Sequence, residues 1–187
     1  MSDLNQDTFS LWCKKIAAGD RDAFSAFFRS TYDRYLRYAC RFVKSRAEAA
    51  DLVQDAYVKI WNNRSSLKTD GSLRSYTYTI VRNLCLNYIR DHQSRVTGLE
   101  QAGALTIHQE VESDDPYDFD EILTELLRLL PERQREAFEL SRFEGLSHDE
   151  IASIMDISPR TVNNHLVAAL NTLRDEAEVL LKSKEVA

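Results

Sequence analysis

Apolar residues recur at spacings of three and four in the first half of the chain. The first such stretch, residues 20–43, carries Ala23, Phe24, Phe27, Phe28, Tyr35, Leu36 and Ala39 in this pattern. Residues 46–63 and 72–92 repeat it, and no alternating run of strand type competes. Because this period matches the turn of an α-helix, the sequence predicts a block of helices in the first 95 residues.

A second helical block is predicted from about residue 121 to 182, and its helices carry start and stop signals. Pro131 suits the first turn of a helix, and Gly145 suits the end of one. Ser147 followed three residues later by Glu150 forms a capping box. Ser158 precedes a proline and is expected to cap the last helix.

The two blocks are separated by residues 96–120, which have no hydrophobic period and carry most of the negative charge. The chain has a net charge of -6, but residues 96–127 contain nine acidic residues and no Lys or Arg. The remainder, with 24 basic and 21 acidic residues, has a net charge of +3. Such a segment cannot bury enough apolar surface to fold. We therefore predict an all-α fold with domains at 1–95 and 121–187, joined by a flexible acidic linker at 96–120.

The C-terminal block contains two helices joined by a tight break, at residues 146–155 and from 158 onward. This is the pattern of a helix-turn-helix, whose second helix enters the major groove of DNA. We expect Val162, Leu166, Leu170 and Leu173 to face inward. The outward residues near the start of that helix, suited to base edges and phosphates, are Arg160, Thr161, Asn163, Asn164 and His165. An ordinary helical hairpin with a solvated face is the weaker alternative, because cap, break and polar tip coincide.

Residues 51–61 form an amphipathic helix with one unusual position. Its apolar face holds Leu52, Val53, Ala56, Tyr57 and Ile60. The opposite face holds Asp51, Gln54, Asp55 and Lys59, with Val58 among them. On these residues alone, a solvated face with one stray valine is favoured over a protein contact.

Residues 72–92 place a basic, polar side opposite an apolar one. The apolar side is predicted to hold Leu73, Tyr76, Thr77, Ile80, Val81, Leu84 and Tyr88, and the other side Thr79, Arg82, Asn83, Leu86 and Arg90. Between residues 64 and 95 there are six basic and two acidic residues. Basic residues with nearby tyrosines suit a single nucleic-acid strand. A plain surface helix with core tyrosines fits the residues equally well.

Composition narrows the class of protein further. The chain is 43% hydrophobic and 29% charged, and no run of apolar residues is long enough to span a membrane. The first eight residues are polar without a signal core, and the three cysteines (Cys13, Cys40 and Cys85) do not suggest a disulfide framework. We therefore expect a cytoplasmic protein that does not insert into a membrane.

Taken together, these motifs resemble the sigma-70 family of bacterial transcription initiation factors, in particular the short extracytoplasmic-function (ECF, group 4) type. Residues 51–61 resemble the region 2.2 helix, and residues 75–83 resemble regions 2.3 and 2.4. Residues 126–173 are similar to region 4, with a typical region 4 entry at 129–138. The resemblance covers nearly the whole chain except its first residues and the linker.

The resemblance implies a factor, not an enzyme, that binds core RNA polymerase at the β′ clamp and the β flap and reads the -10 and -35 promoter elements. It implies that polymerase is bound by Asp51, Gln54, Asp55, Val58 and Lys59. The -10 element would be bound by Arg74, Tyr76, Tyr78, Thr79, Arg82, Asn83, Asn87 and Arg90, with the loop 62–71 enclosing a flipped base. The -35 element would be bound by Arg142, Ser158, Arg160, Thr161, Asn163, Asn164 and His165.

Two positions depart from the family pattern. Tyr76 stands where the family commonly has tryptophan, and Asn163, His165 and Ala168 stand where many relatives have arginine. The phosphate contacts of the last helix are therefore weaker, or come from Arg160, Arg142 and the helix N-terminus. The family also implies an anti-sigma factor as a partner, in many members a membrane-anchored one.

Two other classes of protein share part of this sequence pattern. Residues 161–165 fit a helix-turn-helix regulator of the LuxR type nearly as well, but the first 90 residues lack the β-α alternation of a receiver domain. A metal-dependent helical hydrolase would use Asp51 and Asp55, but the histidines at 92, 108, 148 and 165 are scattered. We therefore predict no metal site and no cofactor.

Overall fold

The computed structural model describes residues 6–43, 45–68, 72–96 and 121–185. Over these ranges it contains eight α-helices, one short 3-10 helix and no strand, which confirms the predicted all-α fold. The chain divides into two compact units, residues 1–112 and 113–187. The predicted linker, apart from Val96 at the end of a helix, lies outside the described residues, and its flexibility stays a prediction.

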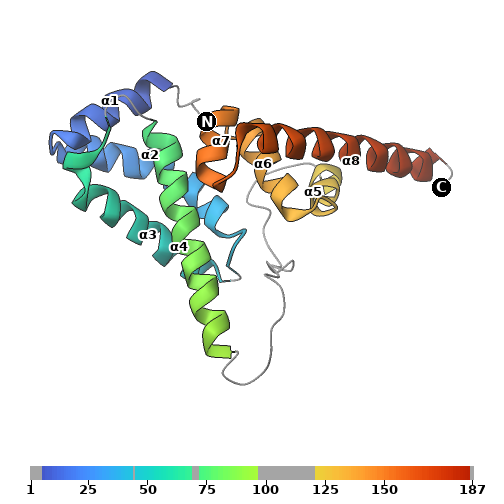
Figure 1. The fold of residues 1–187 in the computed structure, drawn as a ribbon, viewed down its shortest axis with the longest axis horizontal. Coiled ribbons are helices and arrows are strands. Elements are labelled where there is room, and N and C mark those ends of the chain that lie inside the picture. The colour runs from blue at the N-terminus through green and yellow to red at the C-terminus, as the bar shows by residue number, and fades with distance from the viewer. Residues whose placement is uncertain (1–5, 44, 69–71, 97–120, 186–187) are drawn as a thin grey trace. The chain divides into compact units, whose positions relative to one another are not determined.

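The N-terminal unit is built from four α-helices and the 3-10 helix (Figure 1). They are α1 (Gln6–Ala17), α2 (Arg21–Ala39), α3 (Arg46–Asn62), η1 (Arg64–Ser66) and α4 (Leu73–Val96). Helix α4 packs against each of the other three α-helices, and α2 also packs against α1 and α3. Because α4 is surrounded in this way, a wide face of it is buried.

Local signals explain where these helices begin. The Asp20 side chain caps α2 by accepting hydrogen bonds from the backbone N–H groups of Asp22 and Ala23, both at 2.9 Å. Ser45 caps α3 in the same way, because its hydroxyl oxygen accepts a hydrogen bond from the Glu48 N–H at 3.4 Å. The turn between α1 and α2 uses Gly19 at φ 87°, a left-handed conformation that favours glycine.

The core of the N-terminal unit is aromatic. Rings of Phe27, Tyr35, Tyr57 and Tyr78 lie against one another, with the Tyr35 and Tyr78 centroids 4.8 Å apart at an angle of 69°. One pair of buried hydroxyl groups is hydrogen-bonded, since Thr31 Oγ1 and Tyr57 Oη lie 2.7 Å apart. Burial, with the nearby Tyr35 phenol, raises the pKa of Tyr57 far above its ordinary value.

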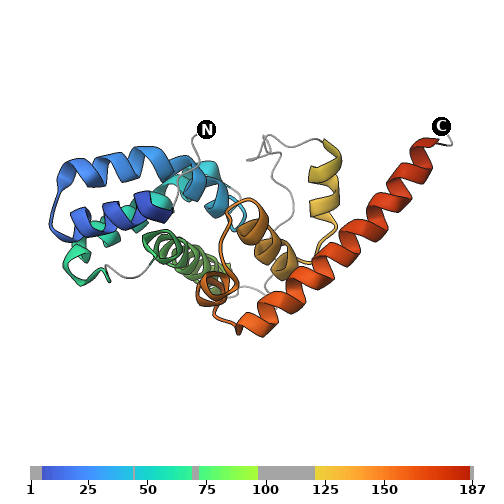
Figure 2. The same ribbon diagram turned by 90° about the horizontal axis from the view of Figure 1, so that it is seen from above.

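The C-terminal unit consists of four helices (Figure 2): α5 (Glu121–Arg128), α6 (Glu132–Arg142), α7 (His148–Met155) and α8 (Pro159–Glu185). Helix α8 packs against each of the other three, and its C-terminal end extends beyond α6 and α7. Its core is mainly aliphatic, and the buried residues shared by α6, α7 and α8 include Leu140, Ile151, Ile154 and Val162. Three carboxylates of this unit, Glu136, Glu139 and Glu144, are also buried.

The predicted caps of the C-terminal unit are present. Ser147 and Glu150 form the capping box of α7, and Ser158 Oγ accepts a hydrogen bond from the Thr161 N–H at 3.1 Å at the start of α8. Asp156 makes the break between the two helices in a left-handed conformation at φ 54°. Asp tolerates this region better than most residues, because its short side chain can bond locally.

One predicted core position in α8 is wrong. Leu170 is 43% exposed, whereas its neighbour Ala169 is fully buried. The buried positions advance from Leu166 to Ala169, three residues on, so the helical turn of about 100° per residue carries Leu170 out of the core. The small alanine allows α8 to approach the rest of the unit closely at this point.

Candidate polymerase and nucleic-acid interfaces

The outward side of α3 holds every residue predicted to bind polymerase. These residues, which we call the α3 face, are all exposed: Asp51, Gln54, Asp55, Val58 and Lys59. The opposite side of the helix, with Val53, Ala56 and Ile60, is fully buried against the unit. Val58 is 56% exposed among charged neighbours. The α3 face therefore offers charge for steering and one apolar side chain for burial in a partner.

The outward side of α4 holds only part of the predicted -10 set. Tyr76, Asn83, Asn87 and Arg90 are exposed, and Arg74 and Thr79 are half-buried. Arg74 lies half a turn round the helix from Asn83, on the side that contacts Phe9 of α1, so we call the other five residues the α4 face. Thr79 donates its hydroxyl to the Ser75 carbonyl at 3.0 Å, so part of its hydrogen-bonding capacity serves the helix.

Two residues of the predicted -10 set lie in the core instead. Tyr78 is fully buried, with its ring centroid 4.8 Å from that of Tyr35 and 4.9 Å from that of Tyr38, and Arg82 is 6% exposed. The prediction that Arg82 shares an exposed side was wrong, as was the inward placement of Tyr76. Helices pack against α4 on several sides, so its buried face includes polar residues that the hydrophobic pattern had assigned to solvent.

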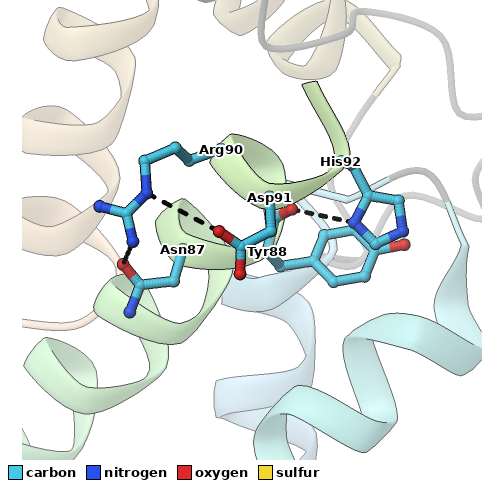
Figure 3. Close-up of polar contacts among 5 residues, drawn as sticks. All are labelled: Asn87, Tyr88, Arg90, Asp91 and His92. Carbon is cyan, nitrogen blue, oxygen red and sulfur yellow. Dashed lines mark hydrogen bonds and ion pairs between the residues drawn. The ribbon is translucent and has the colours of Figure 1, made fainter. Parts of the chain in front are cut away.

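The later part of α4 carries a chain of polar contacts (Figure 3). Arg90 donates from Nη2 to Asn87 Oδ1 at 3.1 Å, and its Nε lies 3.8 Å from Asp91 Oδ1. The Tyr88 and His92 rings stack with centroids 3.9 Å apart. The Arg90 pair is largely exposed, so it contributes little to stability.

Tyr88 also links α4 to the start of α3. The pKa of Tyr88 is raised to about 12, mainly by burial. A hydrogen bond to the Glu48 carboxylate, and the negative charge of that carboxylate, act in the same direction. The phenol is therefore protonated at neutral pH and can donate to Glu48. Sequence patterns did not predict this contact, because it joins two helices forty residues apart.

The loop between α3 and α4 is described as far as residue 68. Arg64 Nη1 donates to the Trp61 carbonyl at 2.8 Å, and its guanidinium carbon lies 4.5 Å from the Trp61 ring centroid. Ser66 Oγ donates to the Asn63 carbonyl at 2.8 Å. Residues 69–71 of the predicted base-enclosing loop lie outside the described residues. These two hydrogen bonds each join residues three positions apart and hold the first turn of the loop.

The start of α8 presents the predicted -35 residues unequally. Ser158, Arg160, Asn163 and Asn164 are exposed, whereas Thr161 and His165 are half-buried. Ser158 Oγ and Thr161 Oγ1 lie 2.8 Å apart, so these two hydroxyl groups serve the cap. Arg142, also in the predicted set, is exposed at the end of α6. We call the exposed residues at 160, 163 and 164 the α8 tip.

Val167 continues the α8 tip and was missed by sequence reasoning. It is 50% exposed, four residues after Asn163 and three after Asn164, so it shares their side of the helix. The helical spacing from Asn163 was the available signal. An exposed valine there can contact an apolar group, such as the methyl of thymine.

The described residues show neither a metal site nor a membrane-spanning helix. Across the described ranges, no group of three His, Cys, Asp or Glu side chains is arranged to hold a metal ion. The helices of the described part also include none that is long and apolar enough to cross a membrane. Cys13, Cys40 and Cys85 form no disulfide bond with one another.

Comparisons with known proteins identify two segments of this chain. The family model "Sigma-70 region 2" matches residues 27–95, and "Sigma-70, region 4" matches residues 120–173. The RNA polymerase sigma factor YlaC of Bacillus subtilis is 30% identical over 172 residues, covering 88% of this chain and 96% of YlaC. The ECF RNA polymerase sigma-E factor of Escherichia coli is 26% identical over 191 residues, covering 95% of this chain and 98% of that protein.

A solved structure shares the fold. It is the sigma factor RpoE in complex with the anti-sigma factor NepR from Bartonella quintana, with a TM-score of 0.61 and 24% identity, covering 82% of this chain and 98% of that one. The helical architecture is therefore that of a sigma factor. The chain belongs to the sigma-70 family, and within it to the ECF type. The predicted family and function are therefore confirmed, and the LuxR-type alternative is not favoured. Sigma factors are non-catalytic initiation factors.

Proposed function

We propose that this ECF sigma factor uses three separate surfaces: the α3 face for core RNA polymerase, the α4 face with the loop at 62–68 for the -10 element, and the α8 tip for the -35 element. The observation that carries the proposal is that these surfaces are exposed within the segments matched by sigma region 2 and region 4. The factor acts where polymerase and promoter DNA meet, in the cytoplasm.

The α3 face is suited to a protein partner. Asp51 and Asp55 complement a basic docking surface, which increases the rate of encounter. Val58, at the centre of the face, supplies an apolar contact. In protein interfaces a small group of buried residues carries most of the binding energy, and we assign Val58 to that group. By family membership we assign this partner surface to the β′ clamp, and a further contact of region 4 to the β flap.

The α4 face is suited to a separated DNA strand. Tyr76 offers a ring for base stacking, Asn83 and Asn87 offer amide groups for base edges, and Arg90 offers a charge for phosphate. Tyr78 and Arg82 are buried, so their proposed role is to support this face rather than to touch DNA. Opening a base step costs a few kcal/mol, and holding the flipped base in a protein pocket offsets that cost.

The α8 tip is suited to duplex DNA but carries little charge. Asn163 and Asn164 can bond to base edges in the major groove, while Arg160 and the helix N-terminus attract phosphate. We propose that Arg142 adds a phosphate contact from the end of α6. Two weak DNA readers in one chain gain from effective concentration once both are attached to polymerase.

An anti-sigma factor is a further partner that we infer from family membership. In the solved complex named above, RpoE is bound to the anti-sigma factor NepR. The likeness at 24% identity shows the fold alone, so the surface that such a partner would cover on this chain is not assigned.

Run-off transcription from a promoter library, randomised at the -10 and -35 elements, tests the whole proposal. With core polymerase and the full chain, we expect transcripts from a narrow set of promoters that share bases at both elements. Core polymerase alone is the control. Transcription without any selection at either element would contradict the proposed DNA-reading surfaces.

A further inference from the structure

Helix α1 lies outside the segment that the family model of sigma region 2 matches. The match to sigma region 2 begins at residue 27, whereas α1 ends at Ala17, and none of the predicted site residues lies on it. The helix is nevertheless firmly packed. Phe9 and Trp12 place their rings 6.4 and 5.7 Å from that of Phe27 in α2, and Phe9 is 1% exposed. Residues that contact α1 are therefore held by a fixed element.

One group of such residues belongs to the loop after α3. The 3-10 helix η1 packs against α1. Cys13 Sγ, in a residue that is 1% exposed, donates to the Lys68 carbonyl at 3.6 Å. The turn that ends α1 also lies beside the loop, since a Cβ added at Gly19 would lie 3.9 Å from Arg64 Nε. Helix α1 thus contacts the loop near both of its described ends.

The start of α4 is held by the same helix. The guanidinium carbon of Arg74 lies 5.7 Å from the centroid of the Phe9 ring, within the range of a cation–π contact. The Tyr35 hydroxyl also donates to the Arg74 carbonyl at 3.4 Å. Arg74 is the second residue of α4 and lies on the side opposite to Asn83. Helix α1 therefore contacts both the loop and the first turn of α4, through its buried residues Cys13 and Phe9.

We propose that α1 sets the spacing between the loop and the α4 face, so that Cys13 and Phe9 are positioning residues for base selection at the -10 element. The inference rests on the proposed function, in which those two parts enclose a flipped base. Selection among bases requires polar groups placed to within about 0.5 Å, and such placement depends on packed residues behind them. The Cys13 thiol and the Phe9 ring occupy that supporting position.

The test measures base preference separately from polymerase affinity. Holoenzyme is assembled from core polymerase and the full-length Cys13→Ala variant. Open-complex formation is then compared on four promoters that differ only at the flipped base, within a promoter selected by the wild-type chain. Because a thiol is a weak donor, we expect the preference for the favoured base to fall by about threefold. Affinity for polymerase and the preference at -35 should stay unchanged.

Phe9→Leu is a second variant that removes the ring beside Arg74 but keeps an apolar side chain. It should reduce the same preference, and it carries the test if circular dichroism shows that Cys13→Ala does not fold. Ile16→Val is the matched control, because Ile16 lies fully buried on the same side of α1. It should lower thermal stability without changing base preference.

Two results would overturn the inference. One is an unchanged base preference in the folded variants of both positioning residues. The other is an equal change in the Ile16→Val control, which would mean that any loss of stability in α1 has this effect. If the wild-type chain itself shows no preference at the flipped base, the proposed function fails, and the inference fails with it.

Discussion

The two units of this protein carry opposite charge, although both are proposed to bind the same polyanion. Residues 1–95 contain 16 basic and 10 acidic residues, a net charge of +6. Residues 121–187 contain 8 basic and 13 acidic residues, a net charge of -5. Since phosphate attraction supplies most of the non-specific affinity for DNA, the N-terminal unit brings its own attraction and the C-terminal unit does not. We infer that -35 reading depends on attachment to polymerase.

The cores of the two units also differ in the side chains that fill them. In the N-terminal unit, aromatic rings meet edge to face, and the buried hydroxyl groups of Thr31 and Tyr57 are hydrogen-bonded to each other. In the C-terminal unit, aliphatic side chains surround buried carboxylates, one of which, Glu139, accepts from Arg135 Nε at 2.6 Å. A basic surface over an aromatic core suits strand capture, whereas an acidic unit relies on short-range hydrogen bonds at the α8 tip.

The largest expected effect comes from the aromatic core. Tyr78→Ala should lower the free energy of unfolding of the N-terminal unit by about 3–5 kcal/mol, as for other buried aromatic side chains. Tyr76→Ala, on the same helix but exposed, should change it by less than about 0.5 kcal/mol and weaken promoter opening instead. Both tryptophans, Trp12 and Trp61, lie in this unit, so urea titration followed by tryptophan fluorescence reports it selectively. Equal stability of the two variants would contradict the burial of Tyr78.

The next effect concerns the α3 face. Asp55→Arg combined with Val58→Glu should reduce affinity for core polymerase by more than about a hundredfold, because it reverses the steering charge and buries a new one. Copurification with core polymerase measures the loss. Leu11→Glu is the matched control, since Leu11 is 53% exposed on α1 and lies off this face. Normal copurification of the double variant would refute the assignment.

A smaller loss of stability is expected in the C-terminal unit. Arg135→Ala leaves the buried Glu139 carboxylate without its closest cation, which should cost about 2 kcal/mol, less than for a fully buried pair because Arg135 is 28% exposed. Far-ultraviolet circular dichroism should show the change, while the tryptophan fluorescence transition stays in place. A shift of both signals together would mean that the units unfold as one.

Paired asparagine variants compare DNA reading by the two units directly. Asn83→Ala should weaken promoter opening, and Asn163→Ala should change base selection at -35, each by about 1–3 kcal/mol if the amide contacts a base edge. The randomised promoter library measures both. Polymerase affinity should be unchanged in each variant. An effect of Asn163→Ala at -10 as large as at -35 would contradict the separation of the two surfaces.

The smallest effect depends on pH. The pKa of Tyr88 is raised to about 12, above its ordinary value of about 10, so its contribution to stability is complete below pH 10 and is lost as the pH rises through about 12. Glu48→Gln removes the negative charge and should bring the pKa of Tyr88 closer to 10. Absorbance titration of tyrosine ionisation measures it. An unchanged titration curve would contradict the contact between Tyr88 and Glu48.

Much of the helical structure could be predicted from local signals. The capping box of α7, the Ser158 cap and the break at Asp156 all depend on residues within a few positions of one another. The α3 face could be predicted as well, because one side of that helix is cleanly apolar. Local hydrogen bonds and a period of 3.6 residues need no knowledge of distant parts of the chain.

Which side chains of α4 and α8 are buried, and which are exposed, could be predicted only in part. Arg82 is buried and Tyr76 is exposed, against the hydrophobic pattern, and Tyr78 is buried, against the DNA contact that the family resemblance implied. The contacts of Cys13 with the Lys68 carbonyl and of Phe9 with Arg74 join α1 to residues more than fifty positions away. Such contacts arise only when helices distant in sequence pack together, and local spacing does not encode them.

By itself, the sequence determined the helices, their caps and the sigma-70 family, because each depends on neighbouring residues or on motifs read in order. Only the tertiary structure decided which side chains of α4 support its surface and which form it. The physical reason is that α4 has several packing partners, so burial there depends on their positions and not on polarity alone. The same packing places α1 against the loop and Arg74, and on that contact rests our proposal that α1 influences how a base is held.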